Sequence, residues 1–187
     1  MAEITVAESA GFCFGVDRAV KLCYQALEQH PHVATLGPII HNQNVVDDLT
    51  RRGARIVDSI ADLQPDECVV IRSHGELKRV LDGLEARGAA CVNATCPNVC
   101  RIQKLVAQSE QEGRRAVIIG EPHHPEVVGL ASWCAQPLVF SGPEDVRAWL
   151  AEAESNRDIP LTVVAQTTCI RELFETSWEI IKKECTN

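Results

Sequence analysis

The sequence repeats one spacing of cysteine and histidine in its two halves. The interval from Cys13 to His41 equals the interval from Cys96 to His124. Each cysteine stands where a helical pattern of apolar residues begins. A spacing shared by two halves of one chain indicates a duplicated structural unit. We therefore expect two copies of one unit, each presenting a thiol and an imidazole.

Both halves alternate short apolar runs with helical patterns. Apolar runs that predict strands occupy residues 4–7, 33–36, 54–57, 68–71 and 91–92 in the first half, and 116–119, 138–140 and 161–165 in the second. Strands that alternate with helices predict βαβ units and parallel sheets. Aromatic residues make up only 4% of the chain, and a core of aliphatic residues suits parallel sheets covered by helices. We predict an α/β fold of two repeated lobes, residues 1–95 and 96–187, each a small parallel sheet flanked by helices.

Polar residues gather at the predicted carboxyl ends of these strands, where open α/β sheets bind their ligands. Beyond the cysteine and histidine, the third element is Ser73-His74-Gly75 in the first lobe and Gln166-Thr167-Thr168 in the second. Imidazoles and hydroxyls donate hydrogen bonds to phosphate, as helix N-termini do. The sequence thus predicts an anion pocket formed by His41, His74, His124 and the threonine hydroxyls.

Glu126 follows His124 closely, with only Pro125 between them. A carboxylate is a poor ligand for phosphate but a useful proton source. The alternative is a glutamate in the first turn of a helix, where it stabilises the helix dipole.

The chain has nine cysteines. We expect no secreted disulfide framework, because the count is odd and the first residues lack the features of a signal peptide. We therefore expect a cytoplasmic protein in a reducing compartment. Cys13 lies between Gly11 and Gly15, which let the backbone approach a bulky ligand, and a helix start favours the thiolate. Because Cys96 holds the equivalent position, the pair predicts a shared metal site. A zinc site that uses Cys91, Cys96 and Cys100 is disfavoured because the spacing lacks a C-x₂-C knuckle.

The net charge is −8. An acidic surface repels a phosphate backbone, so we expect no nucleic-acid partner. No window approaches the roughly 18 apolar residues of a membrane span, so we expect no membrane partner.

Six short motifs stand in a fixed order along almost the whole chain. They are Gly11–Ala19 (GFCFGVDRA), Ile40-His41-Asn42, Ser73-His74-Gly75, Ala94-Thr95-Cys96-Pro97, His124-Pro125-Glu126 and Gln166-Thr167-Thr168. In this order they resemble the 4-hydroxy-3-methylbut-2-enyl diphosphate reductases, the IspH/LytB family. The resemblance implies a trefoil of three lobes related by a pseudo-threefold axis. The two lobes of this chain would be two-thirds of that arrangement.

The resemblance also implies a reductive dehydroxylation in the non-mevalonate isoprenoid pathway. An allylic diphosphate would lose its hydroxyl at a 4Fe-4S cluster and yield isopentenyl and dimethylallyl diphosphate. Electrons would come from a ferredoxin- or flavodoxin-like donor. Carried over to this chain, the resemblance implies the following roles: cluster ligands Cys13 and Cys96, diphosphate ligands His41, His74 and His124, proton donor Glu126, and substrate-positioning residue Thr167.

The family has a third lobe, which supplies a third cysteine. Thr167 holds the place in the second lobe that His74 holds in the first. Counting from Thr167 as many residues as separate His74 from Cys96 leads to a position just beyond Asn187. We therefore expect a truncated form of the reductase. A second hypothesis retains activity because Cys185, a second copy of the chain or a separate polypeptide supplies the missing ligand, although Cys185 continues the apolar stripe of the last helix. A third hypothesis is a non-catalytic anion- or metal-binding module built from the same lobes.

Overall fold

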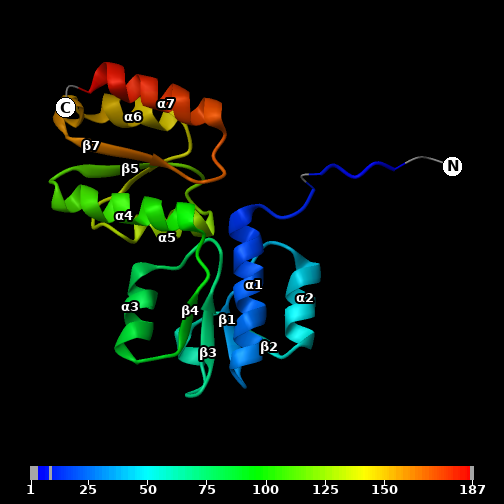
Figure 1. Cartoon of the computed structure of the whole chain (residues 1–187). Helices are drawn as coiled ribbons and strands as arrows, with labels where there is room; N and C mark the ends of the chain where they lie inside the picture. The colour runs from blue at the N-terminus through cyan, green and yellow to red at the C-terminus, as the bar shows by residue number, and fades with distance from the viewer. Residues whose placement is uncertain (1–3, 9, 186–187) are drawn as a thin grey trace.

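Two parallel β-sheets, one in each half of the chain, organise the fold (Figure 1). The structure is a computed structural model that describes residues 4–8 and 10–185. The first sheet has the strand order β2-β1-β3-β4, and the second has the order β6-β5-β7. Their bounds are β1 Val33–Leu36, β2 Ala54–Val57, β3 Cys68–Ile71, β4 Cys91–Asn93, β5 Arg115–Ile119, β6 Leu138–Phe140 and β7 Leu161–Ala165. We call the first sheet with its helices lobe one, and the second sheet with its helices lobe two.

Helices cover both faces of each sheet. In lobe one, α1 (Phe14–Gln29) and α2 (Gln43–Arg51) pack on one face, and α3 (Lys78–Ala86) packs on the other with the short 3₁₀ helix η1 (Ile60–Asp62). In lobe two, α4 (Pro97–Gln111) and α5 (Pro125–Ala131) cover one face. The other face is covered by α6 (Pro143–Glu152) and α7 (Arg171–Glu184), with η2 (Glu154–Asp158) between α6 and β7. The predicted α/β fold of two small parallel sheets flanked by helices is confirmed.

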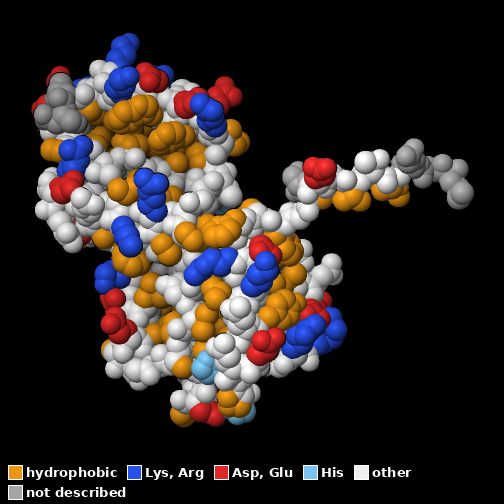
Figure 2. All heavy atoms as spheres, in the orientation of Figure 1, with side chains coloured by type: hydrophobic (Ala, Val, Ile, Leu, Met, Phe, Trp, Pro, Cys, Tyr) orange, Lys and Arg blue, Asp and Glu red, His pale blue; other side chains and the backbone are white. Residues whose placement is uncertain are grey.

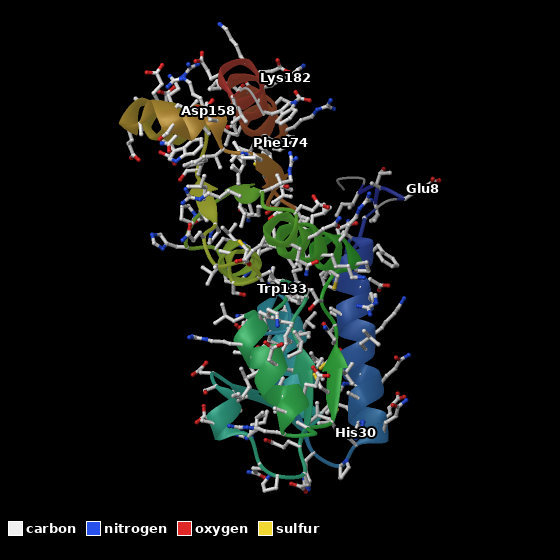
Figure 3. The ribbon with its side chains drawn as sticks, turned by 90° about the vertical axis from the view of Figure 1, so that its left-hand side faces the viewer. Glu8, His30, Trp133, Asp158, Phe174 and Lys182 are labelled. Carbon is white, nitrogen blue, oxygen red and sulfur yellow. The ribbon has the colours of Figure 1, made fainter. Side chains whose placement is uncertain are left out.

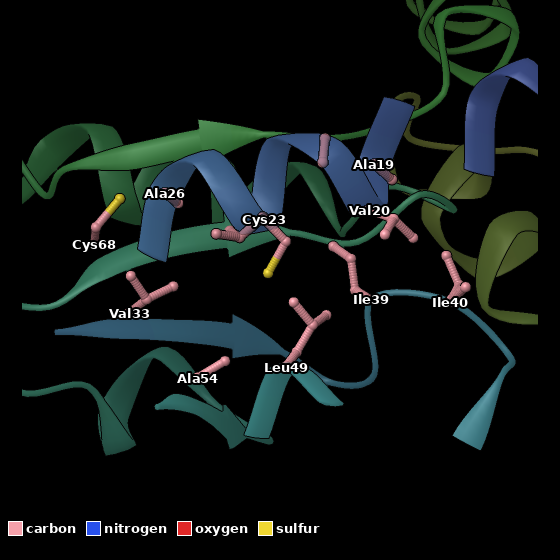
Figure 4. Close-up of a cluster of buried hydrophobic side chains, with 12 residues drawn as sticks. Ala19, Val20, Cys23, Ala26, Val33, Ile39, Ile40, Leu49, Ala54 and Cys68 are labelled. Carbon is pink, nitrogen blue, oxygen red and sulfur yellow. The ribbon is translucent and has the colours of Figure 1, made fainter. Parts of the chain in front are cut away.

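The central strands are apolar along their whole length because both of their faces are covered. All four residues of β1 and of β3 are buried, as are four of the five residues of β5. Figure 4 shows the core of lobe one, where Ala19, Cys23 and Ala26 of α1 face the sheet. These small side chains let α1 pack closely on Val33 and Val70 of the central strands. Continuous apolar runs of this kind are typical of strands buried on both faces.

The predicted strand at residues 4–7 is wrong. The segment has no strand structure, and Ile4 is 87% and Val6 75% exposed. It runs away from both lobes in Figure 1. A β-branched run becomes a strand only where a neighbouring strand supplies hydrogen-bond partners. No strand in the described part of the chain pairs with this segment, so its residues do not form a strand despite their preference for one.

The two lobes meet at the carboxyl ends of their strands. The backbone N–H of Cys96 donates to the carbonyl of Ser73 (2.9 Å), which joins the start of α4 to the end of β3. The backbone N–H of Lys78 donates to the Ser132 hydroxyl (2.9 Å), and its ammonium lies 5.8 Å from the centre of the Trp133 ring. Figure 3 labels Trp133 at this junction.

The described helices include none with the length and apolarity that crossing a membrane requires.

Candidate functional site

Three histidines meet where the lobes join. His41 lies between β1 and α2, His74 follows β3, and His124 precedes α5. Their ring centroids are 4.5 Å apart for His41 and His74, 5.6 Å for His74 and His124, and 6.2 Å for His41 and His124. The structure therefore brings together the three imidazoles that the sequence places at separate strand ends.

The electrostatic surroundings of His74 are positive. Its imidazole is half-buried, and its pKa falls from 6.5 to about 4 because burial disfavours the charged ring and because His41, His124 and Arg72 add positive charge. His74 is therefore neutral at pH 7, and its ring can donate one hydrogen bond and accept another. Imidazole N–H groups donate hydrogen bonds to anions, so this cluster suits an anionic ligand.

The side chain of Arg72 braces the turn that carries His74. Its Nε donates to the carbonyl of Gly75 (3.4 Å), and its Nη2 donates to Glu76 Oε2 (3.1 Å). Gly75 has a φ of +82°, a left-handed conformation that favours glycine. Arg72 was missed in the sequence because nothing but its place before Ser73-His74-Gly75 marks it.

The ring of His124 is held in one orientation by the helix that follows it. Its Nδ1 accepts a hydrogen bond from the backbone N–H of Glu126 (3.1 Å) and so caps α5. In the neutral ring the proton must then reside on Nε2. The Nε2–H is left as a donor for a ligand between the histidines.

The buried Glu126 is hydrogen-bonded to the exposed Thr167. Both oxygens of the Glu126 carboxylate are used: Oε1 accepts from the backbone N–H of Thr167 (2.6 Å), and Oε2 accepts from the Thr167 hydroxyl (2.7 Å). Glu126 is only 2% exposed, whereas Thr167 is exposed at the end of β7. The threonine hydroxyl thus connects a buried carboxylate to the open side of the site, which is the geometry that a proton relay requires.

Gln166 ties the ends of two strands beneath this pair. Its Oε1 accepts from the backbone N–H of Glu121 (3.0 Å), and its Nε2 donates to the Thr168 hydroxyl (2.9 Å). Gly120 allows this close approach, since a Cβ there would lie 2.8 Å from the Gln166 Cβ. The sequence identified the Gln166-Thr167-Thr168 motif but gave Gln166 no role, because its partners become neighbours only when β5 and β7 pair.

A cavity of about 390 Å³ adjoins His124 in lobe two. Its lining mixes polar residues, among them Ser141, Thr168 and Glu121, with the apolar Ile170 and Leu173.

The two candidate cysteines occupy the starts of neighbouring helices. Cys13 is the N-cap of α1 and is exposed, and Cys96 is the N-cap of α4 and is half-buried. Neither thiol makes a capping hydrogen bond. A Cβ on Gly15 would lie 2.5 Å from Cys96 Sγ, so the first turn of α1 packs directly on this sulfur. The Arg18 guanidinium donates to the carbonyl of Thr95 (3.1 Å) and holds the two helix starts together.

The two cysteines can be compared with the needs of a metal cluster that is held by three protein thiolates. Cys13 and Cys96 are soft ligands whose thiols make no capping hydrogen bond, and the lack of a Cβ at Gly15 lets α1 approach the Cys96 sulfur. Within residues 4–8 and 10–185, no three His, Cys, Asp or Glu side chains are grouped to hold a metal ion. Two candidate thiols are fewer than the three that such a cluster needs.

The other cysteines do not join this pair. Cys100 lies one turn after Cys96, and burial raises its pKa. Cys185 follows the last residue of α7 and packs against the core of lobe two with Phe174, and burial raises its pKa as well.

Comparison with known proteins gives one consistent result. A family model described as "LytB protein" matches residues 4–187. The 4-hydroxy-3-methylbut-2-enyl diphosphate reductase of Caldanaerobacter subterraneus subsp. tengcongensis is 35% identical over 97% of this chain, and that of Syntrophotalea carbinolica is 41% identical over 89%. A solved structure of (E)-4-hydroxy-3-methyl-but-2-enyl diphosphate reductase, the terminal enzyme of the non-mevalonate pathway, superposes with a TM-score of 0.82 over 99% of this chain at 35% identity.

The chain spans only part of these relatives. The match covers 63% of the Caldanaerobacter protein, 58% of the Syntrophotalea protein and 65% of the chain in the solved structure.

Proposed function

The chain belongs to the LytB protein family, and we propose that it takes part in the reductive dehydroxylation of 4-hydroxy-3-methylbut-2-enyl diphosphate. In this reaction the allylic C–O bond breaks and a C–H bond forms. Two electrons and two protons enter, the oxygen leaves as water, and the products are isopentenyl and dimethylallyl diphosphate. The single observation that carries the proposal is the cluster of three imidazoles beside the buried Glu126–Thr167 pair.

We assign the diphosphate to His41, His74 and His124. The rings lie within 6.2 Å of one another and His124 keeps its Nε2–H free, which supports hydrogen bonding to several phosphate oxygens at once. The guanidinium of Arg72 adds positive charge close to His74. Charge-assisted hydrogen bonds of this kind are stronger than neutral ones.

We assign proton delivery to Glu126 acting through Thr167. The carboxylate already accepts the hydroxyl hydrogen of Thr167 at 2.7 Å. Once Oε2 carries a proton, this hydrogen bond reverses: Glu126 donates to the threonine oxygen, and the hydroxyl rotates to donate to the leaving oxygen of the substrate. The carboxyl proton then passes to the threonine oxygen as the hydroxyl hydrogen passes to the leaving group. Because Glu126 is buried and Thr167 is exposed, the threonine is the group that touches the substrate.

We assign Cys13 and Cys96 as two ligands of a 4Fe-4S cluster. When bound, this cluster would supply the electrons and bind the substrate hydroxyl at an iron with an open position. The third ligand would come from a polypeptide segment outside these two lobes. A further segment is supported by two exposed apolar side chains that it could cover. Phe14, next to Cys13, is 71% exposed, and Ile170, shortly after Thr167, is 65% exposed.

We further propose a ferredoxin- or flavodoxin-like electron donor. Such proteins are acidic, and the exposed Arg101 and Lys104 follow Cys96 on α4. Figure 2 shows basic side chains among apolar ones on the face where the lobes meet. We place the reaction in the cytoplasm, because all nine cysteines are free thiols, as is usual in a reducing compartment.

We also propose that residues 1–95 and 96–187 are the two lobes of the chain. The sheets share no strand, and the chain passes once between them, from the end of β4 at Asn93 to the start of α4 at Pro97. A fragment of residues 1–95 expressed alone that unfolds cooperatively in urea would support the division. A fragment without a cooperative transition would contradict it.

The experiment that tests the function is anaerobic reconstitution with iron and sulfide. The proposal predicts that the isolated chain binds iron through Cys13 and Cys96, so the variants Cys13→Ser and Cys96→Ser lose bound iron whereas the matched control Cys68→Ala, in the core of lobe one, retains it. Substrate turnover is measured with dithionite as the reductant, with and without a polypeptide that supplies the remaining third of the family's length. Turnover that needs neither cysteine would contradict the assignment.

A second candidate function is a non-catalytic anion- or metal-binding module. It is favoured by the three clustered imidazoles, which can bind an anion without a metal. Tightly bound zinc with no iron, together with pyrophosphate binding and no turnover in any combination, would support this candidate.

A further inference from the structure

The side chain of Arg72 touches both of the segments that carry His41 and His74. A Cβ placed on Gly37, four residues before His41, would lie 3.0 Å from Arg72 Nη1. The Nε of Arg72 donates to the carbonyl of Gly75 (3.4 Å), the residue after His74. One guanidinium therefore packs on the loop after β1 and bonds to the turn after β3.

The guanidinium is held in one orientation by Glu76. Its Nη2 donates to Glu76 Oε2 (3.1 Å), and Glu76 Oε1 accepts from the backbone N–H of Leu77 (3.0 Å). The side chains of Arg72 and Glu76 are only 23% and 12% exposed. A planar guanidinium that bonds through two of its nitrogens has a fixed direction, which the flexible ammonium of lysine lacks. Arg72 therefore has the rigidity that a positioning residue requires.

The second lobe repeats this arrangement around another glycine. Gly37 directly follows β1, and Gly120 directly follows β5. The N–H of Gly37 donates to the carbonyl of Val57, the last residue of β2 (2.8 Å). The N–H of Gly120 donates to the carbonyl of Phe140, the last residue of β6 (2.9 Å). The two glycines therefore hold equivalent places at the ends of the central strands.

In the second lobe the place of Arg72 is taken by Gln166. Its Oε1 would lie 2.9 Å from a Cβ on Gly120, and its Nε2 donates to the hydroxyl of Thr168 (2.9 Å). Thr168 directly follows Thr167, the site residue of this lobe. Each lobe thus has one polar side chain that packs on the glycine after the central strand and bonds to the residue after the site residue.

We infer that Arg72 is a positioning residue that fixes the His41 loop against the His74 turn and so sets the place of the two imidazoles. Their ring centroids are 4.5 Å apart, the shortest separation in the histidine cluster. The backbone N–H of Ser73 also donates to the carbonyl of Ile39 (3.1 Å), so the side chain of Arg72 adds to a backbone bond between the same segments.

The loop has open space on the side where Arg72 holds it. Arg72, Gly37 and Glu76 line a cavity of about 320 Å³. Atoms that border an empty space lack packing contacts on that side, so removal of the guanidinium leaves Gly37 without this support. We therefore expect Arg72 variants to shift the imidazole of His41 relative to that of His74.

The inference deepens the proposed function, since it concerns two of the rings that we assign to the diphosphate. Arg72 acts through Gly37 and Gly75 and is not placed in contact with the substrate. The contrasting explanation is that Arg72 serves the anion by its positive charge alone. Lysine keeps that charge but has no planar fork, so a lysine variant separates the two explanations.

The test compares Arg72→Lys and Arg72→Met with the matched control Arg79→Met, an exposed arginine in the first turn of α3. A third variant, Glu76→Gln, leaves Arg72 in place and removes the charge that holds it. Three quantities are measured on the isolated chain at pH 7. They are the Kd for inorganic pyrophosphate, the nuclear Overhauser effect between the ring protons of His41 and His74, and the urea midpoint of unfolding.

We expect Arg72→Lys and Arg72→Met each to weaken pyrophosphate binding about tenfold, in line with the loss of one hydrogen bond to a charged group. The Overhauser effect between the two rings should weaken in both variants. Glu76→Gln should change both quantities in the same direction, and its combination with Arg72→Met should be no worse than Arg72→Met alone. The control Arg79→Met should match the wild type.

Pyrophosphate binding by Arg72→Lys at the wild-type level would overturn the inference, because charge alone would then account for the role of Arg72. An unchanged Overhauser effect between the rings in a folded Arg72→Met variant would overturn it as well, and a lower urea midpoint alone would then show a merely structural role. If Arg72→Met does not fold, Glu76→Gln decides by the same criterion. A wild-type chain that binds no pyrophosphate would instead contradict the proposed diphosphate site, while the effect between the rings would still test the link that Arg72 makes.

Discussion

The pair of hydrogen bonds between Glu126 and Thr167 makes a quantitative prediction about stability. Each bond, at 2.6 and 2.7 Å, joins a neutral donor to a carboxylate that is 2% exposed. A hydrogen bond to a charged group contributes about 1.5–3 kcal/mol, so Glu126→Ala should cost about 3–6 kcal/mol. For a domain of 150–250 residues each kcal/mol shifts Tm by about 2–4 °C, so we expect Tm to fall by roughly 6–24 °C.

Glu126→Gln separates the charge from the hydrogen bonds. The glutamine Oε1 can still accept from the backbone N–H of Thr167, and the threonine hydroxyl can rotate to accept from the glutamine Nε2. Only the charge assistance is lost, so we expect a cost of about 1 kcal/mol and a fall in Tm of about 2–4 °C. Turnover by the complete enzyme should nevertheless collapse, because an amide holds no transferable proton.

The assay is thermal unfolding of both variants followed by circular dichroism at pH 7, with turnover measured in parallel. The control is Glu152→Gln, an exposed glutamate on α6, which should match the wild type in Tm and turnover. If the alanine and glutamine variants unfold at the wild-type temperature, the two hydrogen bonds do not stabilise the fold as argued. If the glutamine variant retains full turnover, Glu126 is not the proton source.

Three further predictions concern the histidines and the cysteines. Because the pKa of His74 is lowered from 6.5 to about 4, the unfolded chain binds the extra proton between these values. The free energy of unfolding should therefore be highest above pH 6.5 and should fall by roughly 2 kcal/mol, after solvent screening, as the pH falls towards 4. Urea midpoints measured across this range should show the fall. The variant His74→Gln should show a smaller one. Gly15→Ala puts a Cβ 2.5 Å from Cys96 Sγ, so we expect at least twofold less reconstituted iron per chain; unchanged iron would refute the contact. Cys185→Ser should leave bound iron unchanged, because this thiol packs on the core of lobe two; lost iron in a folded variant would make it a ligand.

The fold was predictable to the extent that local pattern decides it. The continuous apolar runs at β1, β3 and β5 require cover on both faces, and helices separate them, so parallel sheets follow from the sequence. The run at residues 4–7 has the same local character but no strand beside it among the described residues. Whether such a run becomes a strand depends on its neighbours in space, which the local pattern does not contain.

The candidate site was predictable where a residue type alone carries the chemistry. His41 and His74 follow neighbouring parallel strands, whose carboxyl ends lie at one edge of the first sheet. His124 follows a strand of the second sheet and joins them only because the lobes pack together. Gln166 was missed because the backbone N–H of Glu121 becomes its neighbour only when β5 pairs with β7. Arg72 was missed although its partners, Gly75 and Glu76, follow it closely in the sequence, because nothing in the local pattern shows that this arginine folds back on the turn.

The central claim is that the three imidazoles at the lobe junction form one diphosphate site. Isothermal titration of inorganic pyrophosphate into the isolated chain at pH 7 tests it most directly. The account predicts one site per chain, weakened about tenfold or more by His41→Ala, His74→Ala or His124→Ala, in line with the loss of a hydrogen bond to a charged group. The control His30→Ala lies at the far end of α1 (Figure 3) and should bind as the wild type does. No binding by the wild-type chain, or equal weakening by His30→Ala, would contradict the claim.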